Sequence, residues 1–120
     1  MRPSGFHHVA IVVRDVEHVA GFYTDVLELP VQARHVTPEG ALRSIWLGVS
    51  AGHFLAVERG EPSHAIVALR ISRADRAAWL EQLARHGVAI EKQSRFTLYV
   101  KDPEGNLVGL SHHPEDSAGI

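Results

Sequence analysis

A short apolar segment occurs twice in this chain, once near the N-terminus and once just past the middle. The sequence HVAIVV at residues 8–13 returns as IVALRI at residues 66–71. Each copy precedes an amphipathic helical stretch and then short apolar runs separated by Gly and Pro. We therefore expect two copies of one structural unit, with a functional cleft between them. The copies differ at their first position, where His8 corresponds to Ile66.

The composition bounds the class of protein. With 120 residues, of which 45% are hydrophobic and 22% charged, the chain can fold as a globular domain, and we expect one domain over residues 1–120. The net charge of −2 offers no basic surface for nucleic acid, and the lack of cysteine excludes disulfides and thiolate chemistry. No apolar run resembles a signal peptide or a membrane span. We therefore expect a cytoplasmic protein with neither a membrane nor a nucleic-acid partner.

The first module, about residues 5–58, is predicted to contain one helix and four strands. The run Phe6–Val13 has the β-branched character of a buried strand. Asp15 is a suitable N-cap for a helix with a 3.6-residue apolar period, and Pro30 ends that pattern. The further strands are expected at residues 31–36, 42–48 and 53–58.

The second module, about residues 64–113, follows the linker-like residues 59–63. A strand over residues 64–71 is expected to lead into a helix that Ser72 caps and that ends with Gly87 at the C′ position. The last three strands are expected at residues 88–92, 96–101 and 106–112, with a type I turn at residues 102–105 (DPEG). The order strand, helix and three strands, present twice, predicts an α+β fold of tandem βαβββ modules in which each helix covers one sheet face.

Strand alternation predicts which side chains face the cavity. Side chains of a strand point alternately to its two faces, so the apolar residues at the odd positions of residues 64–71 assign Ile66 and Arg70 to the cavity. The same sorting gives a mixed apolar and polar lining, which is usual for a small-molecule pocket. Its expected members are Trp46, Phe54, Ile66 and Tyr99, together with His8, Glu58, His64 and Arg70. In the alternative interpretation, Trp46 and Tyr99 only fill the cavity as core.

Motifs at both ends of the chain resemble those of a known family. Residues 8–15 (HVAIVVRD), residues 22–27 (FYTDVL) and residues 100–106 (VKDPEGN) resemble the first and last motifs of the vicinal oxygen chelate superfamily. That superfamily includes glyoxalase I, extradiol dioxygenases, fosfomycin-resistance transferases and bleomycin-binding proteins. The resemblance covers about residues 6–112 and implies paired βαβββ modules, an open barrel-like cavity and frequent homodimers.

The resemblance also implies where a metal would bind. In metal-dependent members, His or Glu side chains from several cavity strands hold a divalent ion. His8 occupies the first such position, whereas the others correspond to Ile66, Ala56 and Gly109. These three residues have no side-chain donor, and a divalent ion needs several N or O ligands, so we expect no metal cofactor. The alternative is a displaced divalent-metal site formed by His8, Glu58 and His64.

Three functions remain open from the sequence. The first is metal-free binding of a small, partly aromatic molecule that contacts Trp46, Phe54, Ile66, Arg70 and Tyr99. The second is a glyoxalase-like lyase, isomerase or dioxygenase, which uses either the displaced metal site or His8 as general base. The third is a non-catalytic interaction module whose purpose is the dimer.

Overall fold

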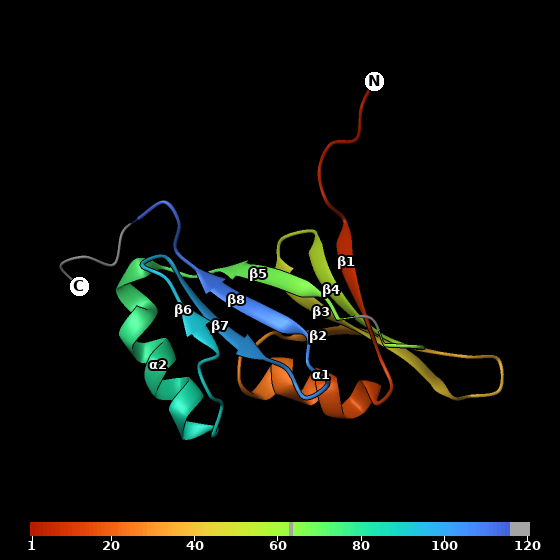
Figure 1. Cartoon of the computed structure of the whole chain (residues 1–120). Coiled ribbons are helices and arrows are strands. Elements are labelled where there is room, and N and C mark those ends of the chain that lie inside the picture. Colours follow the sequence, from red (N-terminus) through yellow and green to blue (C-terminus); the bar gives the residue numbers. More distant parts are fainter. Residues whose placement is uncertain (63, 116–120) are drawn as a thin grey trace. The chain divides into compact units, whose positions relative to one another are not determined.

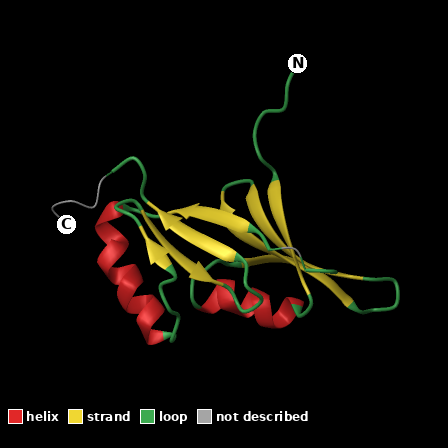
Figure 2. Cartoon of the chain, viewed as in Figure 1, coloured by secondary structure: helices red, strands yellow, loops and turns green. Residues whose placement is uncertain are grey.

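Each copy of the repeated segment forms the first strand of its own four-stranded sheet (Figure 1). The computed structural model describes residues 1–62 and 64–115, and the chain divides into two compact units at the boundary between residues 63 and 64. In the described residues, both units have the order strand, helix and three strands, and a short 3-10 helix precedes the α-helix of the second unit (Figure 2). The predicted α+β class with two βαβββ modules is thereby confirmed.

The first unit pairs its strands in the order β1-β4-β3-β2, with β1 parallel to β4 and the other neighbours antiparallel. Its elements are β1 (His8–Val13), α1 (Val16–Asp25), β2 (Val31–Val36), β3 (Leu42–Ser50) and β4 (His53–Arg59). The helix α1 lies against β3 and β4. The buried sheet residues of this unit alternate along the strands, and they include Ile11, Val13, Ile45, Leu47, Leu55 and Val57. The opposite face of the sheet is therefore left for other contacts.

The helix α1 begins and packs as its sequence predicts. The Asp15 carboxylate accepts a hydrogen bond from the backbone N–H of His18 at 3.1 Å, which confirms Asp15 as the N-cap. Val19, Ala20 and Tyr23 are buried on one side of the helix. A fully buried Val or Leu contributes about 1.5–3 kcal/mol relative to an exposed one, so this side holds the helix to its sheet.

The second unit orders its strands β5-β8-β7-β6, with β5 parallel to β8. Its elements are β5 (Ile66–Arg70), the 3-10 helix η1 (Arg73–Asp75), α2 (Arg76–Arg85), β6 (Lys92–Gln93), β7 (Thr97–Lys101) and β8 (Leu107–Ser111). Neither α2 nor any other helix in the described residues is long and apolar enough to cross a membrane.

The sequence predicted the residues that cap the two ends of α2, and one of these two predictions is confirmed. Gly87 has a φ of 68° and its N–H donates to the carbonyl of Ala84, while the N–H of Val88 donates to Leu83. This is the Schellman arrangement, and it confirms Gly87 at C′. The Ser72 prediction is wrong: Ser72 precedes η1, and its side chain makes no capping bond.

The sixth strand is much shorter than predicted. A strand was expected over residues 88–92, but β6 contains only Lys92 and Gln93. The N–H of Val88 is used by the helix cap, so the chain leaves α2 before it can pair with β7. The first ladder bond toward β7 in this segment comes from Glu91, whose N–H donates to Tyr99.

The turn between β7 and β8 is built around a buried carboxylate. Asp102 is 5% exposed and accepts hydrogen bonds from the backbone N–H groups of Glu104 and Asn106 and from the Asn106 side-chain amide, at 2.9–3.0 Å. The Asn106 Oδ1 in turn accepts from the N–H of Ala65, just before β5. The N–H of Gly105 donates to the carbonyl of Asp102, as a type I turn requires. The Asn106 side chain, which Asp102 holds in place, thus connects the turn to the residue that precedes β5.

We expect Asp102→Ala to lower the free energy of unfolding by about 2–4 kcal/mol, because it leaves buried N–H groups without an acceptor. Urea unfolding followed by circular dichroism measures this change. Glu39→Ala, at an exposed loop position, is the matched control and should change stability by less than about 0.5 kcal/mol. Equal midpoints for the two variants would contradict the role given to Asp102.

Candidate functional site

The face of the first sheet opposite the buried set carries a row of aromatic and polar side chains. Residues paired directly across neighbouring strands point to the same face. The register places His8 opposite Phe54, Phe54 opposite Gly48 and Ala56 opposite Trp46. His8, Trp46 and Phe54 therefore share one face, as the alternation predicts, whereas Val9, which was expected in the core, is 43% exposed. We call this surface the open face.

Five rings gather on or beside the open face. We call His7, His8, His35, Trp46 and Phe54 the aromatic cluster. The indole of Trp46 is its centre: the ring centroids lie 4.5 Å from His8, 5.6 Å from His35, 5.7 Å from Phe54 and 5.9 Å from His7. Trp46 and Phe54 are only partly buried. Their accessible ring surface is suited to a planar ligand, because aromatic rings prefer tilted or offset contacts at 4.5–7 Å.

A hydrogen bond between two imidazoles fixes the orientation of His8. The Nδ1 atoms of His7 and His8 lie 2.9 Å apart. One of them must donate and the other accept, so the bond cannot persist when both rings carry two protons. This bond leaves the Nε2 of His8 without a hydrogen-bond partner among the described residues. The His8 ring lies 4.5 Å from the Trp46 ring, measured between centroids.

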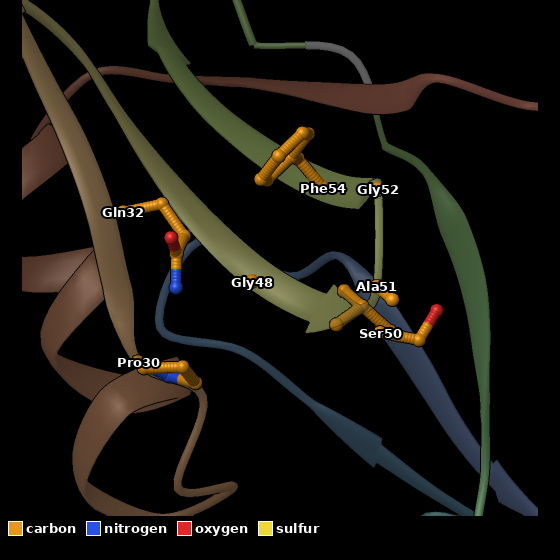
Figure 3. A pocket seen from close by; sticks show the side chains of 8 residues that line it. Pro30, Gln32, Gly48, Ser50, Ala51, Gly52 and Phe54 are labelled. Carbon is orange, nitrogen blue, oxygen red and sulfur yellow. The ribbon is translucent and has the colours of Figure 1, made fainter.

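A hollow of about 340 Å³ adjoins the aromatic cluster near the tip of the β3–β4 hairpin. We call it the hairpin hollow; its lining includes Pro30, Gln32, Gly48, Ser50 and Phe54. Gln32 and Phe54 lie on either side of the Gly48 backbone (Figure 3). A Cβ at Gly48 would approach the Gln32 Nε2 to 2.9 Å, so glycine leaves room for the Gln32 amide. Phe54 is common to the hollow and to the cluster, so one ligand can contact both.

In the second unit the corresponding sheet face is assembled from three strands. The register places Ile66 opposite Leu107, Arg70 opposite Ser111 and Tyr99 opposite Gly109. Ile66, Arg70 and Tyr99 therefore share a face, as the alternation predicts. Ile66 is 73% exposed, and the Lys92 ammonium lies 4.9 Å from the centre of the Tyr99 ring.

The residues at the implied metal positions do not fit a divalent ion. Ala56 is a fully buried methyl group, paired with Ala10 on one side and Trp46 on the other. A Cβ at Gly109 would lie 3.2 Å from the Tyr99 Cε1, so Tyr99 occupies the space that a longer side chain would need. Neither these two residues nor Ile66 offers a donor atom to a metal.

The prediction of a displaced metal site is wrong, because two of its three expected ligands, His8 and Glu58, lie far apart. His8 lies opposite Phe54, whereas Glu58 lies opposite Val12, so the two are four residues apart along neighbouring strands, about 13 Å. Two side chains at this separation do not converge on one ion whose bonds are about 2.1 Å long. His64 lies at the start of the second unit, where its Nδ1 is 3.4 Å from the carbonyl of Gly105. Across residues 1–62 and 64–115, no three His, Asp or Glu side chains come together as metal ligands would.

Several residues of the site were missed by the sequence reasoning. His35 was missed because the alternation of β2 was not used; Ala33 opposite Trp46 and His35 opposite Ser44 would have placed it on the open face. His7 precedes β1 and has no alternation signal. Ser44 was expected to face the cavity but is 1% exposed, and its Oγ has no hydrogen-bond partner among the described residues.

The contact between Gly109 and Tyr99 gives a stability prediction. We expect Gly109→Ala to cost about 1–2 kcal/mol, because the new methyl group forces the Tyr99 ring and the Thr97 methyl group to move. Urea unfolding measures this cost. Gly21→Ala in α1 is the control of opposite sign, since its Cβ would meet nothing within 4 Å; a gain of about 0.5–1 kcal/mol is expected there. A Gly109→Ala variant as stable as the natural chain would contradict the close contact.

Comparisons with known proteins agree with this fold. A family model described as Glyoxalase/Bleomycin resistance protein/Dioxygenase superfamily matches residues 5–110. Among solved structures, an integron cassette protein from the mobile metagenome of the Halifax Harbour sewage outfall has a TM-score of 0.78 at 18% identity, covering 92% of this chain and 99% of that one. Lactoylglutathione lyase from Agrobacterium tumefaciens has a TM-score of 0.78 at 17% identity, with coverage of 94% and 96%.

The fosfomycin resistance protein FosX from Listeria monocytogenes, in complex with Mn(II) and sulfate, has a TM-score of 0.74 at 18% identity, covering 92% of this chain and 93% of that one. Identities this low show a shared fold alone. No curated protein matches the chain in sequence. Since the family model extends over nearly the whole chain, the chain belongs to the Glyoxalase/Bleomycin resistance protein/Dioxygenase superfamily.

Proposed function

We propose that this protein binds a small, partly aromatic organic molecule on the open face of its first sheet, without a metal ion. The observation that carries the proposal is the aromatic cluster around Trp46, whose indole lies 4.5 Å from His8 and 5.7 Å from Phe54. A planar ligand on this surface gains from apolar burial, at about 25 cal/mol per Å², and from ring–ring contact worth about 0.5–1.5 kcal/mol.

The hairpin hollow supports a ligand that also has a polar substituent. Phe54 connects the hollow to the aromatic cluster, and the Gln32 amide and Ser50 hydroxyl supply hydrogen-bonding groups at its wall. A mostly apolar surface with a few placed polar groups is typical of small-molecule sites. The ligand therefore combines a ring of one or two fused cycles with a hydroxyl, carbonyl or amide group.

The donor chemistry supports binding without a metal. Where metal-dependent relatives are expected to supply ligands, this chain has a buried methyl group at Ala56 and a glycine under the Tyr99 ring at position 109. A divalent ion bound by this chain would need other donors.

Two measurements on the full chain test the proposal. The first is elemental analysis of protein purified without chelator or added metal, which we expect to show no stoichiometric zinc, nickel, manganese or iron. The second is a titration with 2-naphthol, a neutral bicyclic aromatic with one hydroxyl group, which should raise the melting temperature and saturate. Stoichiometric metal would overturn the metal-free part, and the absence of any saturable effect with 2-naphthol would count against aromatic binding.

The orientation of His8 favours one further candidate, a metal-free lyase or isomerase with His8 as general base. Its Nδ1 is held by His7, and its Nε2 has no partner among the described residues, which is the geometry of an available base. Because a structural relative is a lactoylglutathione lyase, formation of lactoylglutathione is the assay to use. Turnover that His8→Ala abolishes and His64→Ala preserves would favour the enzyme; no turnover would leave binding as the function.

We also propose that the protein is a homodimer, as the family resemblance implies. Size-exclusion chromatography with light scattering measures the mass directly, and a mass equal to that of one 13.2 kDa chain would contradict it.

A further inference from the structure

A second hollow, of about 250 Å³, lies in the second unit where β5 and β8 end side by side. We call it the terminal hollow; it is lined by Ala68, Leu69, Arg70, Ser111 and His113. Arg70 and Ser111 are direct partners in the parallel pairing of β5 with β8, so the ladder itself brings a guanidinium and a hydroxyl to one place.

The Arg70 guanidinium is largely uncommitted. The Arg70 Nη1 donates one long hydrogen bond, to the carbonyl of His113 at 3.4 Å. Among the described residues, it has no carboxylate within 4 Å. A guanidinium carries five N–H donors in a planar fork that matches the two oxygens of a carboxylate or phosphate. Most of these donors are free to bind a ligand.

The Ser111 hydroxyl adds a further donor. Its Oγ accepts hydrogen bonds from the Thr97 Oγ1 at 2.9 Å and from the N–H of His113 at 3.3 Å. Because both of these bonds use lone pairs of the oxygen, its own hydrogen remains available to donate. The His113 ring is held edge-on against Phe96, with centroids 4.9 Å apart.

The charges around the terminal hollow also favour an anion. The neighbouring residue His112 accepts a hydrogen bond from Arg76, a buried cation whose acceptors in the described residues are all neutral. The Glu115 carboxylate pairs with the Arg73 guanidinium at 3.7 Å. Within residues 1–62 and 64–115, neither Arg70 nor Arg76 forms an ion pair with a carboxylate, so this end of β8 carries positive charge, which raises the local concentration of anions.

We propose that the terminal hollow binds a small oxyanion, the carboxylate or phosphate group of a ligand, with Arg70 as the bidentate donor and Ser111 as the second. This site takes charge rather than an aromatic ring, and it lies in the other unit, so it does not depend on the binding function proposed for the open face.

The test is an NMR titration of the ¹⁵N-labelled full chain with inorganic phosphate and, separately, with acetate, against sodium chloride at equal ionic strength. We expect saturable shifts of the Ser111 and His113 amides with at least one oxyanion and none with chloride. The tighter of the two oxyanions identifies the chemistry of the group. Shifts that stay linear, or that chloride reproduces, would overturn the proposal.

Two substitutions locate the site. Arg70→Gln should weaken binding of the effective oxyanion by about tenfold or more, because a charge-assisted pair of bonds is lost. Arg43→Gln makes the same charge change at an exposed position of the first unit and should leave the affinity unchanged. Equal affinity in both variants would overturn the assignment to Arg70, and a dispersed amide spectrum shows that each variant is folded. The 2-naphthol titration is unaffected by either result.

Discussion

Replacing Trp46 by alanine should weaken the binding of 2-naphthol by about fiftyfold. Trp46 is the centre of the aromatic cluster, and its indole contacts the rings of His8, His35 and Phe54. Removal of the indole takes away both the apolar area that a ligand covers and the ring–ring contact, together about 2–3 kcal/mol. Isothermal titration calorimetry of the two proteins measures the difference.

The control variants separate stacking from a general loss of structure. Trp46→Phe keeps a ring at this position and should lose less than about tenfold in affinity. Trp79→Phe removes the other tryptophan, which lies on α2 in the second unit, and should bind as the natural chain does. It also leaves Trp46 as the only indole, so its fluorescence reports the site directly. Unchanged affinity in Trp46→Ala would show that the ligand does not lie on the open face.

The fold was predictable because two independent signals agree along this chain. The repeated segment gave the two modules, and the turn residues between the apolar runs gave most strand bounds; the strand at residues 31–36, for example, is observed as β2 (Val31–Val36). The failures occur where a local bond overrides the pattern. The cap of α2 uses the N–H of Val88, so the apolar residues 88–90 do not join the sheet. Ser72 does not cap α2 because η1 lies between them.

The candidate site was only partly predictable. Alternation placed His8, Trp46 and Phe54 on one face, because a parallel and an antiparallel pairing meet at β4 without a shift in register over these residues. It did not predict which residues along a strand lie close to one another. Glu58 shares the face with His8 but lies at the other end of the strand pair, and only the register shows this. His7 lies outside any strand, so its bond to His8 was not accessible from periodicity.

A buried cation should dominate the stability of the second unit. Arg76 is 8% exposed, and its guanidinium donates to the His112 Nε2 at 2.9 Å and to the Gln93 Oε1 and the Ser94 carbonyl at 3.0 Å. These bonds connect the first turn of α2 to β6, to the loop after it and to the residue after β8. They also fix the histidine tautomer: a guanidinium cannot accept, so Nε2 accepts, and Nδ1 donates to the carbonyl of Glu115.

We expect Arg76→Ala to lower the free energy of unfolding by about 3 kcal/mol, because three acceptors lose a charged donor. Two of these acceptors belong to β6 and to the loop that leads from β6 to β7. For a domain of this size, that loss lowers the melting temperature by about 10–15 °C, measured by calorimetry. Arg85→Ala, near the other end of α2 and exposed, removes the same side chain and should cost less than about 0.5 kcal/mol. Arg76→Met keeps most of the apolar stem of the side chain. If its free energy of unfolding falls about as far as that of Arg76→Ala, the effect comes from the hydrogen bonds. If its stability stays near that of the natural chain, packing of the stem is responsible. In the natural chain the ¹⁵N shifts of His112 should report an unprotonated Nε2, and a protonated Nε2 would contradict the bond on which this prediction depends.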